Sequence, residues 1–496
     1  MPNERIAVLC DMHLIPDTAS SQYVYLLRAV ERMRRDGVDR VITLGDLTAC
    51  GELEAWDLYL DAVQGLAHCE VIGNSDVRDP ATADTLLART ATVETRVGER
   101  CVIGLSTPDG VISDADFARL EAARDGDVIL LHYYLDALKA ASRARLHEVL
   151  AQKQLLVLHG HAHRDFDYVQ GRSHVMGFRG LDPDKASGGY PCMVYLTLGD
   201  EVTREEICFA PLRESIASVR AHLGVSCVRL HEDVAYALEH EIGFIELRCD
   251  KKEWSYDPTL TPLIEAWRTR TNGFLSVHMP NLKWADGQVV GGERWQEVLE
   301  YALLLRADHL TIHPPRRTSR LDVLENKVCF DALLAHYVEA VRRLPDTTTV
   351  GIENLHWDKG EAIDESRPFA IVPEEQLLWV DAINQALAKP GRVGCLLDTG
   401  HARNNGALTK RYPLSRWYAA IGSRAVAYHV HQSVKQADGD LKNHKPIEDW
   451  LGSMISYCGF FDAWERGILR HAPIFLEVKG WKNHEISLQA IDRLLV

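Results

Sequence analysis

The chain has 496 residues, more than one hydrophobic core usually organises, which favours two domains of roughly 200 to 280 residues each. Its formal net charge of −16 disfavours a protein that coats nucleic acid or an anionic membrane, since both surfaces repel it. Nucleic-acid binding at a local basic groove stays open, as does homo-oligomerisation. The cysteines form no CxxC pair, and no apolar run reaches the roughly 18 residues that span a bilayer, so we expect a reduced, cytoplasmic protein without a membrane partner.

The first part of the chain alternates short β-branched or Leu-rich runs with helical patterns, which is typical of an α/β protein. A helix is predicted over 20–37, because apolar residues recur at helical spacing and a glycine ends the segment. Little helix separates the runs near 172–210, so we expect a partly antiparallel edge to close a first domain at 1–212. The predicted strands are 5–10, 40–45, 69–73, 101–106, 127–132, 154–159, 173–178 and 192–198.

The second part, 213–496, repeats one pattern of strand followed by helix. The predicted strands are 224–228, 243–248, 273–279, 309–314, 349–354, 394–398, 426–431 and 473–478. Such a series of βα units in a segment of this length predicts a (β/α)8 TIM barrel, whose functional residues lie at the carboxyl ends of its strands.

Side chains suited to metal binding follow the strand runs of the first domain. In DMH, two such side chains spaced by two residues leave the strand on the same side. Carboxylate, imidazole and amide groups together suit two divalent cations such as Mn, Fe or Zn, bridged by a carboxylate, that polarise a phosphoryl group and activate water. His159 is predicted to stay within its strand. The candidate ligands are Asp11, His13, Asp46, Asn74, His132, His161 and His163.

The series DxH, GD, GN, a lone His and GHxH, in this order, resembles the calcineurin-like metallophosphoesterase superfamily. The resemblance implies a four-layer αββα fold, hydrolysis of phosphate esters and a ligand role for all seven residues, with Asp46 and Asn74 also catalytic. Many members carry a histidine directly after the GN asparagine, where it protonates the leaving group, whereas this chain has Ser75. Asp76 is the nearest candidate for the missing general acid.

A second set of polar residues marks the carboxyl ends of the barrel strands. Glu353 and Glu477 each end an apolar strand, and a buried carboxylate without a partner is costly, so a metal is favoured. In LLDTGH, a spacing of three lets Asp398 and His401 converge on one cavity. The full set is His278, His313, Glu353, Asp398, His401, His429, His444 and Glu477.

This array resembles the xylose isomerase-like TIM barrels and, within them, most closely endonuclease IV. The resemblance implies two or three metals (Zn, Mn or Fe) in the barrel, with Glu353 and Glu477 as catalytic residues. The groups it assigns are His278, His313 and Glu353 for one metal, Glu353, Asp398, His429 and Glu477 for a second, and His401 with His444 for a third.

Two positions depart from the endonuclease IV pattern. Its aspartate two residues before the last histidine is Lys442 here, although Asp440 lies near enough to substitute. Its tyrosine that helps distort DNA is Asn281, which together with the acidic net charge weakens the case for cleavage of duplex DNA. Arg316 and Arg317 follow a barrel strand and are candidate phosphate-binding residues, with Lys442 as a third.

Three functions are compatible with these patterns. The leading hypothesis is a bifunctional, metal-dependent phosphoester hydrolase acting on nucleotides, nucleic-acid ends or small phosphate esters. The second is a sugar-phosphate phosphatase fused to a sugar isomerase or epimerase, in which the barrel holds one metal. The third treats one domain as a degenerate scaffold that senses a phosphorylated ligand, with Ser75 pointing to the first domain. The number of metals in the barrel separates the first two, and an Asp46→Asn variant tests the third.

Overall fold

The chain forms two compact units in the computed structural model, which describes residues 4–90, 93–185, 187–199, 201–358, 360–362, 364–437 and 441–496. The first unit comprises Met1–Ala210 with Leu451–Gly459, and the second comprises Pro211–Trp450 with Phe460–Val496. The short segment Leu451–Gly459, which the sequence pattern includes in the second domain, therefore belongs to the first unit. The N–H of Gly188 donates to the carbonyl of Leu451 within that unit (2.6 Å).

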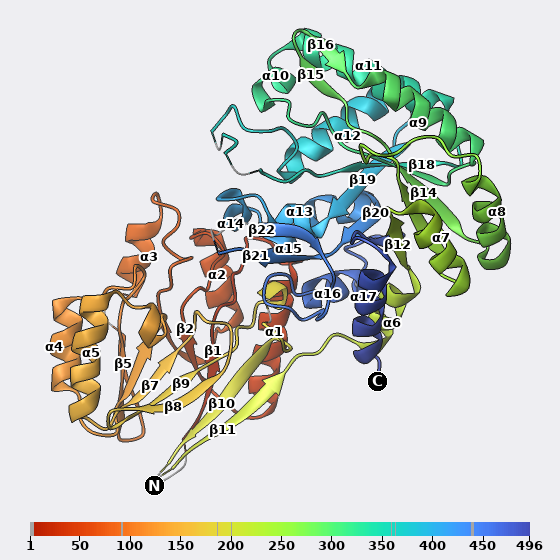
Figure 1. Cartoon of the computed structure of the whole chain (residues 1–496). Coiled ribbons are helices and arrows are strands. Elements are labelled where there is room, and N and C mark those ends of the chain that lie inside the picture. Colours follow the sequence, from red (N-terminus) through yellow and green to blue (C-terminus); the bar gives the residue numbers. More distant parts are fainter. Residues whose placement is uncertain are drawn as a thin grey trace. The chain divides into compact units, whose positions relative to one another are not determined.

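Two sheets form the centre of the first unit (Figure 1), with the strand orders β11-β10-β1-β2-β3 and β4-β5-β6-β7-β9-β8. The strands are β1 Glu4–Leu9, β2 Arg40–Leu44, β3 Ala67–Val71, β4 Val93–Val97, β5 Arg100–Gly104, β6 Val128–Leu131, β7 Leu156–His159, β8 Phe166–Gln170, β9 Ser173–Gly177, β10 Cys192–Leu198 and β11 Val202–Cys208. The helices are α1 Ser21–Arg35, α2 Leu53–Ala62, α3 Ala83–Arg89, α4 Asp114–Ala122 and α5 Ala140–Gln152, with 3-10 turns η1 Leu135–Ala137 and η2 Pro183–Lys185.

The predicted antiparallel edge of this unit is confirmed, because β8 pairs with β9 and β10 with β11 in antiparallel register. The structure adds β4, β8 and β11 to the strands that the sequence pattern predicts. All three lie at sheet edges. Their sequences VETRV, FDYVQ and VTREEIC carry charged residues among the apolar ones, as edge strands commonly do, so the search for apolar runs misses them.

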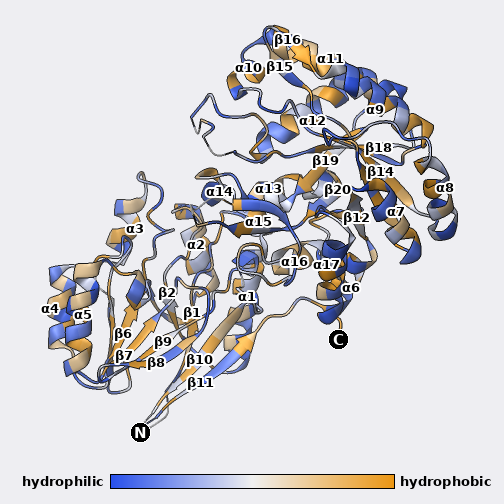
Figure 2. Cartoon of the chain, in the orientation of Figure 1, coloured by the Kyte–Doolittle hydropathy of each residue, from blue (hydrophilic) through white to orange (hydrophobic). Residues whose placement is uncertain are grey.

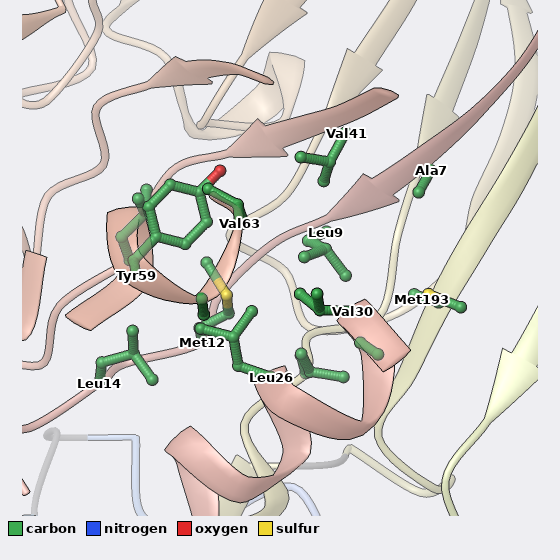
Figure 3. Packing of buried hydrophobic residues seen from close by; sticks show 14 of the residues in the cluster. Ala7, Leu9, Met12, Leu14, Leu26, Val30, Val41, Tyr59, Val63 and Met193 are labelled. Carbon is green, nitrogen blue, oxygen red and sulfur yellow. The ribbon is translucent and has the colours of Figure 1, made fainter. Parts of the chain in front are cut away.

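Hydrophobic clusters fill the spaces between four layers of the first unit. The cluster between the two sheets includes Ile6, Val8, Leu44, Leu130 and Leu158. Outside the first sheet, α1 and α2 pack Leu26, Val30 and Tyr59 against Leu9 and Met193 (Figure 3). A third cluster joins α4 and α5 to the second sheet. The order helix, sheet, sheet, helix confirms the αββα fold.

Helix α1 illustrates how the sequence sets an element and its packing. The side chain of Ser20 accepts a hydrogen bond from the N–H of Tyr23 and caps the helix. Leu26 and Val30 lie one turn apart on the buried face. Gly37, with a φ of +69°, follows the last turn and redirects the chain, as the terminal glycine predicts.

Eight parallel strands of the described part of the second unit close into a barrel, which confirms the predicted fold. The barrel strands are β12 Leu223–Cys227, β13 Phe244–Arg248, β14 Phe274–His278, β17 His309–Ile312, β18 Thr349–Glu353, β19 Val393–Asp398, β20 Ala425–Val430 and β23 Ile474–Leu476. Two hairpins are β15 Lys283–Ala285 with β16 Gln288–Val290, and β21 Gln432–Lys435 with β22 Leu441–Lys445. The helices are α6 Arg213–Ala221, α7 Leu230–Glu239, α8 Leu260–Thr271, α9 Gly292–Leu304, α10 Arg320–Leu324, α11 Lys327–Arg343, α12 Pro373–Leu387, α13 Thr399–Arg403, α14 Leu408–Arg411, α15 Leu414–Ile421, α16 Cys458–Glu465 and α17 Trp481–Arg493, with the 3-10 turn η3 Gly422–Arg424.

Hydrophobic residues concentrate in the strands. In Figure 2, β10 (CMVYLTL) lies mostly in the hydrophobic range, whereas its edge neighbour β11 (VTREEIC) includes hydrophilic residues. Inside the barrel, Leu396, Ala427 and Phe475 pack together. Of the helices in the described residues, none combines the length and the apolar character needed to cross a membrane.

Candidate metal centres

The predicted ligands of the first unit lie just beyond the carboxyl ends of strands. Asp11 and His13 follow β1, Asp46 follows β2, Asn74 follows β3, His132 follows β6, and His161 and His163 follow β7. The strands β1, β2 and β3 run parallel to one another, as do β6 and β7. Parallel neighbours end at the same edge of a sheet, and this edge is where such folds carry ligand sites.

The Asp46 carboxylate lies between two groups of side chains. Its Oδ2 is 3.7 Å from Nε2 of His13, and its Oδ1 is 3.4 Å from Nε2 of His132. His163 joins the first group, with its Nε2 3.5 Å from Nε2 of His13 and 3.7 Å from Oδ1 of Asp11. The two oxygens of Asp46 therefore face different groups, which is the arrangement of a carboxylate that bridges two cations.

The second group of the first unit gathers around His132, which is fully buried. Nδ1 of His161 lies 3.1 Å from Nε2 of His132, and Oδ1 of Asn74 lies 3.2 Å from the same nitrogen. Nδ1 of His132 is 2.9 Å from the carbonyl oxygen of Leu44. That contact fixes the ring so that Nε2 faces the group, as in a histidine ligand held by a backbone carbonyl. The structure thus brings all seven predicted ligands of this unit together.

Several of these ligands have left-handed backbone conformations. The φ angles are +49° for Asp11, +48° for His13, +51° for Asp46, +67° for His161 and +51° for His163. Residues other than glycine adopt this region at a cost on the order of 1–3 kcal/mol each, and such strain clusters at functional sites. The surrounding fold therefore holds these side chains in a conformation that local preference disfavours.

The glycines of the GD and GN motifs permit close approach of the ligand loops. A Cβ at Gly73 would lie 2.3 Å from the backbone nitrogen of Asp46. A Cβ at Gly45, whose φ is +85°, would lie 2.7 Å from Nδ1 of His132. Any larger residue at either position would displace a predicted ligand.

Ser75 is turned toward the carboxylate of Asp46. Its N–H donates to Oδ1 of Asp46 (2.6 Å), and its Oγ–H donates to Oδ2 (2.7 Å). Both are hydrogen bonds to an ionisable carboxylate and fully buried. Ser75 thus holds Asp46 in position, a role that the sequence pattern does not reveal.

Asp76, the general acid proposed from the sequence, is fully buried between its own loop and the segment that follows β2. Its Oδ1 accepts hydrogen bonds from the N–H (2.8 Å) and Oγ1–H (3.0 Å) of Thr48, and its Oδ2 accepts one from the N–H of Gly73 (2.9 Å). Burial raises the pKa of Asp76 to about 6. Because its oxygens are occupied by backbone and hydroxyl donors, the geometry favours a bracing role over proton donation to a substrate.

Burial sets the protonation states of the first centre. It raises the pKa of Asp11 to about 7, despite the opposing effect of His132. It lowers the pKa of His161 to about 4 and that of His163 to about 3. These two histidines are neutral near pH 7, so each has a ring nitrogen lone pair for a metal.

The barrel candidates lie at the carboxyl ends of the strands, as the TIM-barrel pattern predicts. His278, Glu353 and Asp398 end β14, β18 and β19, His313 and Glu477 directly follow β17 and β23, His429 lies near the end of β20, and His401 and His444 lie on α13 and β22.

The two carboxylate oxygens of Glu353 approach different side chains, as those of Asp46 do. Its Oε2 lies 3.1 Å from Nε2 of His278 and 3.0 Å from Nε2 of His313. Its Oε1 lies 3.3 Å from Nδ1 of His429 and 3.1 Å from Nδ1 of His401. The two oxygens of Glu353 thus face different groups of potential metal ligands.

Four atoms around His429 fit a cation. Glu353 Oε1, Asp398 Oδ2, His429 Nδ1 and Glu477 Oε2 are all buried and have no hydrogen-bond partner among the described residues. The carboxylate oxygens lie 3.3, 3.8 and 3.1 Å from Nδ1 of His429. Buried polar atoms are normally satisfied, and one cation at their centre would satisfy all four.

Glu246 supports His429 from the opposite side, and the sequence pattern misses it because it lies inside β13 rather than at a strand end. Its Oε1 is 2.9 Å from Nε2 of His429. It also accepts hydrogen bonds from Ser226 (3.1 Å), Ser276 (3.0 Å) and Thr311 (2.5 Å). A carboxylate behind a histidine ligand fixes the ring and increases its basicity.

A third group contains His431, a histidine absent from the ligands predicted by sequence. Nε2 of His431 lies 3.2 Å from Oδ1 of Asp398, and Nε2 of His444 lies 3.4 Å from Oε1 of Glu477. With His401, these side chains present ligand atoms within 4.8 Å of one another. His429 and His431 in HVH have the same spacing as His161 and His163 in GHAH, so the sequence did contain a signal for His431.

Lys442 stands where the endonuclease IV pattern has an aspartate, and Asp440 is the nearby candidate to substitute for it. Asp440 lies outside the described residues. Lys442 is exposed on β22 and does not line the cavity at the barrel centre, so the structure does not bring it to the other candidates.

A small cavity of about 70 Å³ lies over the barrel centre. Arg316 and Arg317, the candidate phosphate-binding residues, line it, and both approach Asp358 (3.9 and 4.0 Å). Arg248 and Asp250 also line it and are absent from the residues predicted by sequence. Arg248 ends its strand as Glu353 does, so its position at the end of β13 was a usable sequence signal.

No protein-family profile and no curated protein sequence matches the chain. Solved structures that match include a D-tagatose 3-epimerase-like protein, 19% identical, with a TM-score of 0.40 over 55% of this chain and 97% of that one. A D-allulose 3-epimerase from Methylomonas sp. is 14% identical, with a TM-score of 0.39 over 55% of this chain and 96% of that one. A dimetal phosphatase from Danio rerio is 14% identical, with a TM-score of 0.34 over 42% of this chain and 96% of that one.

Proposed function

We propose that the chain is a bifunctional, metal-dependent phosphoester hydrolase with one metal centre in each unit. The observation that carries this proposal is one carboxylate divided between two ligand groups in each centre: Asp46 in the first unit and Glu353 in the barrel. Such a carboxylate is suited to bridging two divalent cations. We infer two Mn, Fe or Zn ions in the first unit and two or three Zn, Mn or Fe ions in the barrel.

Cations bound in this way polarise a phosphoryl oxygen and lower the pKa of a water molecule. In the first unit, Asp46 provides negative charge to both ligand groups, and Ser75 keeps its two oxygens in place. Because Ser75 faces Asp46 and Asp76 is enclosed, neither donates a proton to the leaving group. We therefore expect this centre to prefer esters whose leaving group needs no protonation.

The barrel has the metal-ligating side chains that the same chemistry needs. Glu353 joins the group of His278 and His313 to the group of His429, and Glu246 orients His429. We propose phosphate esters as substrates of both centres, including nucleotides and nucleic-acid ends.

The proposal is tested by two separate changes in the full-length protein, Asp46→Asn and Glu353→Gln. Each should lower the metal content of its own centre and reduce the hydrolysis that depends on it by about 100-fold or more, since one bridging charge is lost. Elemental analysis and assays with bis-p-nitrophenyl phosphate and an abasic oligonucleotide provide the readouts. Asp61→Asn and Glu325→Gln remove exposed carboxylates outside both ligand groups and serve as controls.

Unchanged metal content and unchanged hydrolysis in both variants would show that the hydrolase proposal is wrong. Loss of metal from the first unit in Asp46→Asn without any loss of hydrolysis would instead identify that unit as a binding scaffold.

A second candidate function is sugar isomerisation or epimerisation in the barrel, with the first unit as a sugar-phosphate phosphatase. The set of four unsatisfied atoms on Glu353, Asp398, His429 and Glu477 favours it, because that set alone holds one metal between two glutamates. One metal per barrel, with interconversion of ketohexose epimers, would support this function over hydrolysis.

A further inference from the structure

The barrel cavity contains a buried guanidinium that has no part in the hydrolysis proposed above. Arg248 ends β13, and its side chain is only 4% exposed. It lines the same cavity as His313, His401 and Glu477. A buried arginine is unusual unless its charge is matched, so its partners define what it can do.

Arg248 has two carboxylate partners. Its Nε donates to Oδ1 of Asp250 (2.8 Å) and its Nη2 to Oδ2 (2.9 Å), a two-pronged contact that fixes the plane of the guanidinium. Its Nη1 contacts Oε1 of Glu477. A guanidinium has five N–H groups, so these contacts leave one donor on each terminal nitrogen.

The charge around Arg248 changes when the centre is loaded. Asp250 is shared between Arg248 and Lys251, whose Nζ lies 3.1 Å from its Oδ2. Glu477 also belongs to both the second and the third ligand groups of the barrel. A cation there takes up the negative charge of Glu477 and leaves Arg248 with an excess of positive charge. Lys251, Arg316 and Arg317 line the same cavity and add to that excess.

We propose that Arg248 is the anion-binding residue of the barrel and that its two remaining donors bind two oxygens of a phosphoryl group. Asp250 positions it for this role. The inference rests on the proposed function, since it assigns the substrate of the barrel to the phosphate esters. A neutral sugar would not require a cationic wall around the cavity.

The test measures binding of inorganic phosphate to the metal-loaded full-length protein by calorimetry. Every arm carries Asp46→Asn, so that the first centre does not contribute its own phosphate binding. Arg248→Met should weaken phosphate binding about 10-fold to 100-fold, as expected for lost hydrogen bonds to a charged group, with the metal content unchanged. Arg248→Lys keeps the charge without the planar fork and should fall between.

Two further variants control for a general loss of charge and for misfolding. Arg270→Met removes an equal charge from an exposed ion pair with Glu241 and should leave phosphate binding unchanged. Arg248→Met combined with Asp250→Asn removes the buried pair together, so it tests the inference if Arg248→Met alone fails to fold.

Equal phosphate binding in Arg248→Met and its parent, at equal metal content, would overturn the inference. So would a parent that binds D-fructose but not phosphate. The two proposals fail separately. Phosphate binding that does not depend on Arg248 leaves the hydrolase proposal standing. Phosphate binding that depends on Arg248, without any hydrolysis that depends on Glu353, removes the hydrolase proposal for the barrel alone.

Discussion

Single residues behind the ligands shape both centres. Ser75 donates two hydrogen bonds to Asp46, and Glu246 lies 2.9 Å from the ring nitrogen of His429 that faces away from the cluster. Outer partners of this kind orient the ligands and tune their basicity. Ser75, at the position where the resemblance leads us to expect a histidine, thus makes contacts that hold the carboxylate of Asp46 in place.

Replacing Ser75 with alanine should weaken metal binding in the first unit. Loss of the Oγ–H donor to Asp46 is expected to lower the metal affinity about 10-fold to 100-fold, as for other outer partners of metal ligands. Competition with a chelator, followed by elemental analysis, measures the change. Ser142→Ala removes a different buried serine, which accepts a hydrogen bond from the N–H of Ile112, and should leave the metal affinity unchanged. Equal metal affinity in Ser75→Ala and the parent would rule out this role for Ser75.

At the scale of elements, strand ends carry the candidate ligands and helix faces provide the packing. In both units, the predicted ligands gather where parallel strands end, while helix faces close the hydrophobic layers behind them. The position of Asp46 therefore depends on the packing of β1 and β2 against α1. A defect in that packing should therefore lower the stability of the first unit, since the predicted metal ligands themselves remain.

Leu26 in α1 provides a test of this layer. It is fully buried against the first sheet, whereas its neighbour Leu27 is 41% exposed. Leu26→Ala should lower the free energy of unfolding by about 2–5 kcal/mol, because it removes apolar contact and leaves a cavity. Leu27→Ala should change it by less than about 0.5 kcal/mol. Denaturant unfolding compares the two, and similar effects of both changes would contradict the packing described for α1.

The whole molecule combines two centres in which buried carboxylates and histidines crowd together. In the barrel, burial opposes the charged form of His429, but Glu246 and Glu353 outweigh it and raise its pKa to about 10. The protonated ring then favours the metal-free fold below its ordinary pKa of 6.5, and this stabilisation is lost as the pH rises through about 10. A cation that binds Nδ1 must displace this proton.

Metal binding by the barrel should therefore strengthen as the pH rises toward about 10. One displaced proton corresponds to about a tenfold gain in affinity per pH unit. Competition with a chelator between about pH 6 and about pH 8, on protein carrying Asp46→Asn, measures the slope. Glu246→Gln removes a negative charge that raises the pKa of His429, so the metal affinity should depend less on pH. A metal affinity independent of pH would contradict the protonated state of His429.

The sequence alone was sufficient for the fold of both units and for most candidate ligands. Continuous apolar runs predict the central strands, because those strands are buried on both faces, and helical spacing predicts α1, because one face of that helix is buried. Motifs such as GHAH are local, so His161 and His163 could be found without knowing their partners. Edge strands β4, β8 and β11 could not, because charged residues interrupt their apolar runs.

The tertiary structure decided which side chains meet and what each one does. Asp76 is a plausible acid by sequence, and only its hydrogen bonds with Thr48 and Gly73 indicate a brace. Glu246 and Arg248 acquire their roles from residues on other strands, Ser276 and Glu477 among them, that are distant in the sequence. The physical reason is that hydrophobic periodicity is a property of neighbouring residues, whereas the charge balance of a buried site depends on contacts that form only when the strands close into sheets and a barrel.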